Sequence, residues 1–173
     1  MDIKVSEIQP EGMTVEMTER PEDIGDLGLD IMPAGPAWGR FKAVRTGTTV
    51  YLSGEVTAKV ELVCSRCGKT YVFDAGSRFE LDINPFESMA AEEENELQSG
   101  ELEVEFYKDD TIDLSGLMRE QVLLQVPMKP LCREECLGLC QYCGKDLNEG
   151  QCGCEPPTGH PGLSGLKDLL KDK

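Results

Sequence analysis

The stretch VYLSGEVTAKVELVCSRCGK, residues 50–69, indicates most clearly how this chain folds. Apolar and polar residues alternate along it, which is typical of a β-strand buried on one face. Gly54 interrupts the apolar face and predicts a bulge or a bend in the strand. The stretch ends in Cys-x-x-Cys-Gly, a tight turn that aims the thiols of Cys64 and Cys67 at one point. We therefore expect a long strand that leads into a cysteine site.

Three further segments continue the alternation and extend the predicted sheet. They are KTYVFDA (69–75), RFELDI (78–83) and ELEVEFY (101–107). Consecutive strands with one wet and one packed face predict an antiparallel β-meander or a partly closed barrel. Upstream, MTVEMTER (13–20) is compatible with a strand, and the proline- and glycine-rich residues 21–39 predict a loop.

One helix is predicted at about residues 113–126. Asp113 is a suitable N-cap residue, and Pro127 ends the helix because the residue before a proline disfavours the helical conformation. The apolar residues that recur at helical spacing are Leu114, Leu117, Met118 and Val122. The expected fold class is therefore α+β, with this single helix packed on the sheet.

The domain organisation follows from these elements. Residues 1–130 are expected to form a β-rich core domain, interrupted by a polar, glutamate-rich loop at about 87–101. Residues 131–173 are expected to form a cysteine-rich tail that binds zinc and closes with a short helix.

Six cysteines and no histidine fall within LCREECLGLCQYCGKDLNEGQCGC, residues 131–154, and they admit several chemistries. Disulfides require an oxidising compartment, and the N-terminal residues lack the basic and apolar segments of a secretory signal. A thioredoxin-like redox pair is expected at a helix N-terminus, whereas Cys64 and Cys67 lie between two predicted strands. Both chemistries are therefore disfavoured.

An iron–sulfur site is harder to dismiss. The spacing of Cys136, Cys140 and Cys143, C-x3-C-x2-C, resembles the cluster motif of radical S-adenosylmethionine enzymes. Those enzymes need a barrel of roughly 200 residues or more, and only 30 residues follow Cys143. A plain cluster-binding tail stays open as an alternative.

Structural zinc is the interpretation that the spacing favours. Tetrahedral zinc takes four ligands, so eight cysteines predict two Zn²⁺ ions per chain. The simplest partition gives one Cys-x-x-Cys-Gly turn to each site, although an exchange of Cys136 or Cys140 between the sites stays open. The first site would then hold Cys64, Cys67, Cys132 and Cys136, and the second would hold Cys140, Cys143, Cys152 and Cys154.

The charge of the chain bears on its partners. The net charge is −16, and residues 80–128 contain two basic and fourteen acidic residues, a balance of −12. Such a surface repels the phosphates of nucleic acids. It serves either to keep the protein soluble or to dock a basic partner, and Glu92, Glu93, Glu94 and Glu96 are the expected steering charges. No apolar run approaches the roughly 18 residues of a membrane span, and we expect a cytoplasmic protein.

No active site is predicted. His160, the single histidine, lies in the sequence CEPPTGHPG and is expected to be a solvated linker residue. Without a second candidate base, a Ser–His–Asp set is excluded, and no phosphate-binding glycine loop occurs. We expect neither an enzyme nor a small-molecule substrate.

Three motifs together resemble a known family. VELVCSRCGK (60–69), IDLSGLMREQVLLQVPMKPLC (112–132) and CLGLCQYCGKDLNEGQCGC (136–154) are similar to the cysteine-rich bacterial form of the YceD-like family of large-subunit ribosomal RNA accumulation proteins. The similarity runs from about Val50 to the end of the chain. Gln141 replaces the proline usual in the turn, and Gly162 replaces an arginine of the family's tail, but neither change removes a cysteine.

The resemblance implies a non-enzymatic factor needed for normal levels of large-subunit ribosomal RNA. Its partner would be a ribosomal protein or the assembling large subunit. The alternative is direct RNA binding through the zinc-bound turns, which the acidic charge disfavours. The residues available for that alternative are Arg66, Lys69, Tyr142 and Lys145.

Overall fold

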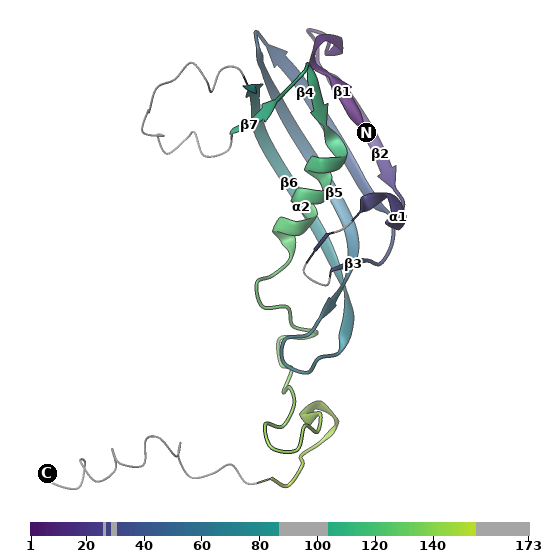
Figure 1. Ribbon diagram of the computed structural model, residues 1–173, viewed down its shortest axis with the longest axis vertical. Coiled ribbons are helices and arrows are strands. Elements are labelled where there is room, and N and C mark those ends of the chain that lie inside the picture. Colours follow the sequence, from purple (N-terminus) through teal and green to yellow (C-terminus); the bar gives the residue numbers. More distant parts are fainter. Residues whose placement is uncertain (26, 29–30, 87–103, 155–173) are drawn as a thin grey trace, which may run out of the picture. The chain divides into compact units, whose positions relative to one another are not determined.

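The structure is a computed structural model that describes residues 1–25, 27–28, 31–86 and 104–154 (Figure 1). It divides into two units, which are described one at a time. The sheet unit comprises residues 1–65 and 69–132, and the cysteine-rich unit comprises residues 66–68 and the described residues from 133 onward. The predicted acidic loop and the predicted terminal helix lie outside the described residues.

A six-stranded sheet forms most of the sheet unit. Its hydrogen-bonded order is β2-β4-β5-β6-β7, and β3 pairs with β5 beside this path. Strands β1 (Asp2–Lys4) and β8 (Thr111–Asp113) form a separate two-stranded sheet. The strands of the large sheet are β2 (Met13–Glu19), β3 (Met32–Pro33), β4 (Ala37–Thr46), β5 (Thr49–Val63), β6 (Thr70–Pro85) and β7 (Val104–Tyr107).

Two α-helices accompany the sheet, and a single one was predicted. Helix α2 (Leu114–Gln125) lies within the predicted range, with Asp113 at its N-cap position, and runs along one face of the sheet (Figure 1). The unpredicted α1 (Pro21–Ile24) is one turn long and begins at a proline, whose fixed φ suits the first helical position. Short 3-10 helices occur at Val5–Glu7 (η1) and Leu147–Glu149 (η3). None of the described helices is long and apolar enough to cross a membrane.

The sheet differs from the prediction in four respects. Strand β4 was not predicted, and it begins within the range expected to be a loop, residues 21–39. β7 pairs with β6 in parallel, so the sheet is mixed and not an antiparallel meander. Its edge strands β2 and β7 do not pair with each other, so it is open and not a partly closed barrel. The segments at 69–75 and 78–83 form one continuous strand, β6, because β5 supplies partners for it without a break from Thr70 to Ile83. Alternation reveals a strand's faces but not its direction or its neighbour.

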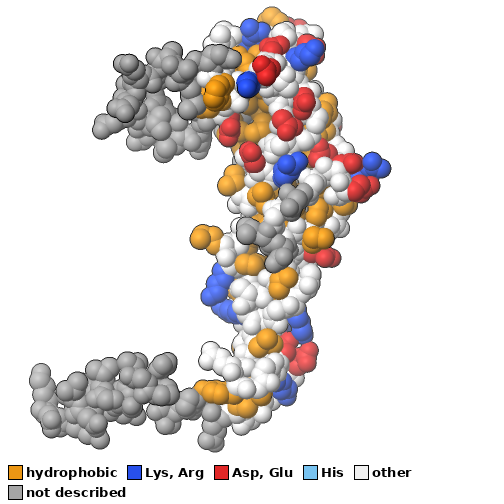
Figure 2. Space-filling model, viewed as in Figure 1, with side chains coloured by type: hydrophobic (Ala, Val, Ile, Leu, Met, Phe, Trp, Pro, Cys, Tyr) orange, Lys and Arg blue, Asp and Glu red, His pale blue; other side chains and the backbone are white. Residues whose placement is uncertain are grey.

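The core lies between α2 and the sheet. The buried face of α2 carries Leu114, Leu117, Met118 and Val122, as the helical spacing predicts. Facing it are the alternate residues of β5, from Val50 to Leu62. Each fully buried side chain of this kind contributes about 1.5–3 kcal/mol by leaving water. Seen from the side that α2 covers, acidic side chains are spread over the sheet unit with basic ones among them (Figure 2).

Gly54 does not mark the predicted bulge. Its strand continues in register, with Gly54 facing both Phe41 and Phe79. The ring of Phe79 occupies the space a side chain would need, because a Cβ at Gly54 would lie 2.4 Å from its Cζ atom. The same ring meets Phe41 edge to face, with centroids 6.2 Å apart. The glycine therefore serves packing between aromatic residues.

Candidate metal centres

The first cysteine group is formed by Cys64, Cys67, Cys132 and Cys136, whose sulfur atoms all lie within 4.8 Å of one another. Four sulfurs around one tetrahedral ion, with bonds of about 2.3 Å, are separated by about 3.8 Å, so the group needs little adjustment to hold an ion. Cys132 is half-buried, and the other three are buried.

The end of β5 positions the first turn of this group. The N–H of Cys64 donates to the carbonyl oxygen of Lys69 at 2.9 Å, and Gly68 takes the positive φ of 70° that closes the turn. The N–H and the hydroxyl of Ser65 both donate to the carbonyl oxygen of Pro130, at 2.9 and 3.0 Å. These bonds bring the segment that carries Cys132 beside the turn.

Tyr71 lies close to the first group, and the charges of that group affect the pKa of its hydroxyl. Burial raises the pKa of the Tyr71 hydroxyl, and the neighbouring charges of Cys64 and Cys132 raise it further. The same thiolate repulsion is the reason that such a group favours a cation at its centre.

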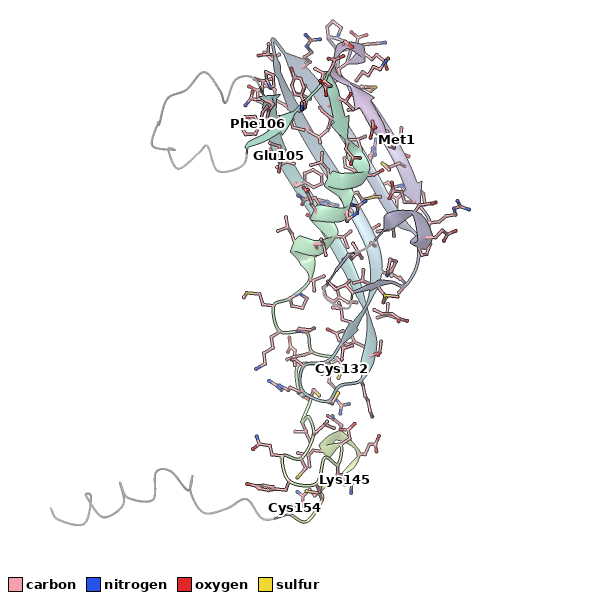
Figure 3. All side chains as sticks on the ribbon, in the orientation of Figure 1. Met1, Glu105, Phe106, Cys132, Lys145 and Cys154 are labelled. Atoms are coloured by element: carbon pink, nitrogen blue, oxygen red, sulfur yellow. The ribbon has the colours of Figure 1, made fainter. Side chains whose placement is uncertain are left out.

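The second group is formed by Cys140, Cys143, Cys152 and Cys154, again with all sulfur atoms within 4.8 Å of one another. Its turn repeats the first one closely. The N–H of Cys140 donates to the carbonyl oxygen of Lys145 at 2.8 Å, and Gly144 has a φ of 72°. Cys143 and Cys154 are exposed, so this group is more open to solvent than the first. Figure 3 labels Lys145 and Cys154 in this unit.

Backbone N–H groups stabilise the thiolate form of Cys140 in the second group. Hydrogen bonds from Cys143 and Tyr142 lower the pKa of the Cys140 thiol to about 6, and the bond from Tyr142 measures 3.4 Å. In contrast, hydrogen bonds with Cys143 and Cys152 raise the pKa of the Cys154 thiol to about 12. Four thiolates in this space therefore need a cation to coexist.

The donor sets fit a structural metal. Each group supplies four thiol sulfurs, which complete a tetrahedral ion and leave no open position for a substrate or for water. Soft sulfur ligands suit zinc and iron–sulfur clusters alike, so the donors define the class of metal and not its identity. The structure thus brings all eight predicted cysteines into two groups, each able to hold a metal ion, along the partition that the spacing favoured.

Three residues acquire roles that the spacing did not predict. The guanidinium of Arg66, a candidate RNA contact, donates to the carbonyl oxygens of Glu134 and Cys136 at 3.2 and 2.8 Å. The ammonium of Lys145, another candidate, donates to the carbonyl oxygen of Gln151 at 3.1 Å. Asn148 donates from its side chain to the sulfur of Cys136 at 3.5 Å. The sequence signal for Asn148 was its position two residues after Asp146. At this spacing an aspartate side chain can accept the N–H of the later residue and so cap a turn. His160 lies outside the described residues.

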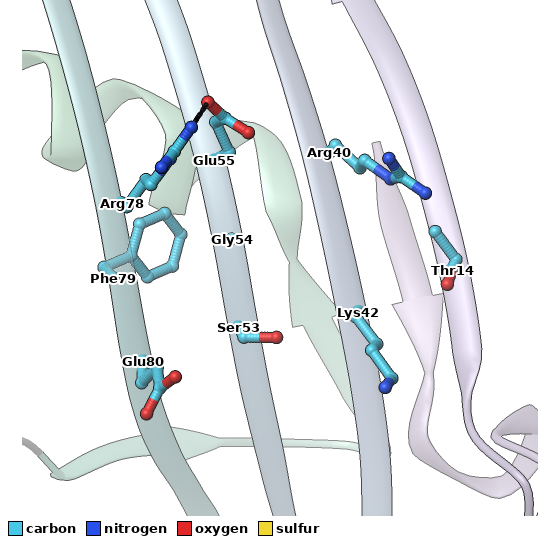
Figure 4. A pocket seen from close by; sticks show the side chains of 9 residues that line it. All are labelled: Thr14, Arg40, Lys42, Ser53, Gly54, Glu55, Arg78, Phe79 and Glu80. Atoms are coloured by element: carbon cyan, nitrogen blue, oxygen red, sulfur yellow. Dashed lines mark hydrogen bonds and ion pairs between the residues drawn. The ribbon is translucent and has the colours of Figure 1, made fainter.

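A pocket of about 550 Å³ opens on the sheet face opposite α2 (Figure 4). Both arginines of the pocket form ion pairs: Arg78 with Glu55 at 2.9 Å and Arg40 with Glu16 at 3.3 Å. It is lined by Thr14, Arg40, Lys42, Ser53, Gly54, Glu55, Arg78, Phe79 and Glu80. The lining contains neither histidine nor cysteine.

Comparisons with known proteins show what this chain is similar to. The family model "Large ribosomal RNA subunit accumulation protein YceD" matches residues 52–170. The chloroplastic YCED homolog 1 of Zea mays is 38% identical over 64 residues, which cover 36% of this chain and 22% of that protein. The corresponding homolog of Arabidopsis thaliana is 32% identical over 65 residues, covering 36% and 20%.

A relative of broader coverage is an uncharacterized protein of Mycobacterium bovis, 32% identical over 111 residues, which cover 62% of this chain and 49% of that protein. The chain thus spans about half or less of the length of these three curated relatives. No solved structure matches the chain.

Proposed function

Because this chain belongs to the YceD family, whose name describes accumulation of large-subunit ribosomal RNA, we propose that it is a non-enzymatic zinc-binding factor that supports this accumulation and the assembly of the large subunit. Two four-cysteine groups of closed geometry support the structural role of the metal. The metal would hold the cysteine-rich unit in one conformation, because residues 133–154 include only one short 3-10 helix and few buried side chains.

The partner that we propose is a basic ribosomal protein, and one cavity carries this proposal. It has a volume of about 400 Å³ and opens beside β7, β8 and the first turns of α2. Its floor is apolar, and one basic residue, Lys108, stands among its acidic ones. The acidic residues are Asp2, Glu105, Asp113 and Glu120, and the apolar ones include Ile83, Phe106, Ile112 and Leu117.

The electrostatics of this cavity favour a cationic guest. Burial raises the pKa of the Glu120 carboxyl, and the charges of Glu105 and Asp113 raise it further, while Arg119 opposes them. A lysine or arginine side chain combines an apolar stem with a charged head, which matches an apolar floor with an acidic rim. Phe106, 38% exposed, adds an aromatic face for such a cation. Figure 3 labels Glu105 and Phe106 on β7.

Direct RNA binding remains the second candidate, favoured by one observation. Tyr142 is 55% exposed on the turn of the second cysteine group, where its ring is available to stack on a base. Two of the basic residues that would accompany it, Arg66 and Lys145, donate to backbone carbonyls within the cysteine-rich unit. Four-thiolate zinc sites add a formal charge of about −2 each, which opposes phosphate binding.

Affinity capture separates the two candidates. The wild-type chain is immobilised at low salt and offered purified large-subunit proteins and, separately, naked large-subunit RNA. We expect it to retain basic proteins, and Glu105→Gln with Glu120→Gln to reduce this retention. The matched control is Glu61→Gln with Glu80→Gln, which removes the same charge from exposed positions on the sheet face opposite α2. Tight RNA binding at about 0.15 M salt that Lys145→Glu abolishes would support the RNA candidate instead.

A further inference from the structure

Asn148 belongs to one cysteine group by position and contacts the other with its side chain. In sequence it lies between Cys143 and Cys152 of the second group. Its side-chain nitrogen nevertheless donates to the sulfur of Cys136, a member of the first group, at 3.5 Å.

The orientation of the Asn148 amide is set by its other partners. Its side-chain oxygen accepts the N–H of Leu137 at 2.9 Å and the guanidinium of Arg133 at 2.6 Å. Both of these groups are donors only, so the oxygen must face them and the nitrogen must face Cys136. The second hydrogen of the amide nitrogen goes to the carboxylate of Asp146, at 2.7 Å.

The backbone holds Asn148 in this place. The carboxylate of Asp146 accepts the N–H of Asn148 at 2.8 Å, which caps η3. The N–H of Leu147 donates to the carbonyl oxygen of Gly138 at 2.9 Å, and Leu139 pairs with Asp146 as an isolated bridge. The loop of the second group is therefore bonded to residues 136–140, which begin with a cysteine of the first group and end with a cysteine of the second.

From this geometry we propose that Asn148 is a positioning residue that couples the two metal centres. An ion in the second centre orders the loop from Cys143 to Cys152 and so holds the Asn148 amide against Cys136. The N–H of that amide stabilises the Cys136 thiolate, which favours an ion in the first centre. Coupling of this kind is reciprocal, so an ion in the first centre also favours one in the second. The proposal rests on the metal-binding part of the proposed function.

The expected size of the effect comes from the behaviour of groups that hydrogen-bond metal ligands. Removing such a group typically lowers metal affinity by about 10- to 100-fold. We expect a loss of this size at the first centre when Asn148 is changed, although Asn148 lies in the loop of the second.

Two variants separate positioning from a general structural role. Asn148→Asp keeps an oxygen for Leu137 and Arg133 but replaces the N–H donor with a second carboxylate oxygen beside the Cys136 sulfur. Asn148→Leu removes all of the side-chain bonds. The control is Gln151→Leu, a polar-to-apolar change at an exposed position of the same loop.

The experiment uses the full zinc-loaded chain. Zinc is withdrawn with increasing chelator, exposed thiols are alkylated, and mass mapping reports the protection of each cysteine. We expect Asn148→Asp to expose Cys64 and Cys136 at about 10- to 100-fold lower chelator than the wild type, and Gln151→Leu to change nothing. Wild-type-like protection of Cys64 and Cys136 in Asn148→Asp would overturn the proposal, as would a loss of protection confined to the cysteines of the second group.

A mutant cycle tests the coupling itself. Cys152→Ser disables the second centre, and we expect it to weaken protection of Cys64 and Cys136 in the wild type but not in Asn148→Leu. An equal effect in both backgrounds would show that Asn148 does not transmit the coupling. A wild-type chain that binds no metal would instead refute the metal-binding function, so the two failures are distinguishable.

Discussion

Adding a single methyl group at Gly54 tests the aromatic packing in the core of the sheet unit. A Cβ there would lie 2.4, 2.7 and 3.0 Å from three carbons of the Phe79 ring, and the first two distances are shorter than such atoms approach in folded proteins. The ring must move, and its edge-to-face contact with Phe41 moves with it. Inserting a methyl group into a packed core costs about 1–3 kcal/mol.

The matched control is Gly76→Ala. Gly76 lies in the neighbouring strand β6, where an added Cβ meets nothing within 4 Å. Replacing a strand glycine by alanine stabilises a protein by about 0.5–1 kcal/mol, because the unfolded chain loses freedom. This gain is common to both substitutions, so the difference between them isolates the overlap with Phe79. We expect Gly54→Ala to be the less stable by about 1–3 kcal/mol.

Urea unfolding followed by circular dichroism measures this difference, with metal content verified in each variant. In thermal unfolding it corresponds to about 3–9 °C, at about 3 °C per kcal/mol for a chain of this size. In a Phe79→Ala background the two substitutions should become equivalent, since the obstructing ring is gone. Equal stability of Gly54→Ala and Gly76→Ala in the wild-type background would refute the reasoning.

Three further predictions concern the metal and the acidic cavity. Protein purified under reducing conditions should contain two zinc ions per chain by elemental analysis, whereas iron or an absence of metal would contradict the zinc assignment. Cys64→Ala should expose Cys132 and Cys136 to alkylation, because their sulfurs lie in the group that loses a ligand, and should weaken the protection of Cys152 and Cys154 only by the coupling between the two centres. Glu120→Gln should raise the melting temperature at pH 7 but not near pH 4, as measured by calorimetry. The raised pKa of Glu120 means that the folded state holds its proton more tightly, so its contribution to stability is present at low pH and is lost as the pH rises through the raised pKa. An increase of the same size at both pH values would show that this carboxyl is not perturbed by its neighbours.

Local patterns of apolar residues predicted the main strand and the main helix. The alternation after Val50 predicted β5, and the helical spacing after Asp113 predicted α2 within one residue at each end. These patterns are reliable because a half-buried strand and a one-sided helix each repeat their contact with the core at a characteristic period. The segment before Thr48 was predicted less well. The predicted loop at 21–39 contains the short elements α1 and β3 and the start of β4, although the buried residues of β4 alternate with exposed ones.

The structural role of Gly54 was ambiguous from the local sequence. From sequence, Gly54 suggested a bulge, because a missing side chain on an apolar face has several causes. The structure identifies the cause as the ring of Phe79, a residue 25 positions away that β5–β6 pairing brings opposite it. Gly68 and Gly144 were interpretable in advance because the Cys-x-x-Cys-Gly turn itself requires a positive φ.

The sequence by itself determined the long strand, the main helix and the two Cys-x-x-Cys-Gly turns, because period and ligand spacing are local properties of the chain. The tertiary structure decided which further cysteines complete each group of four. Only the tertiary structure decided that the sheet is open and mixed, that acidic side chains from β7, β8 and α2 meet over an apolar floor, and that Asn148 of one loop contacts a cysteine of the other group. These features depend on which distant segments pair, and pairing is settled by the summed burial and hydrogen bonding of the whole unit.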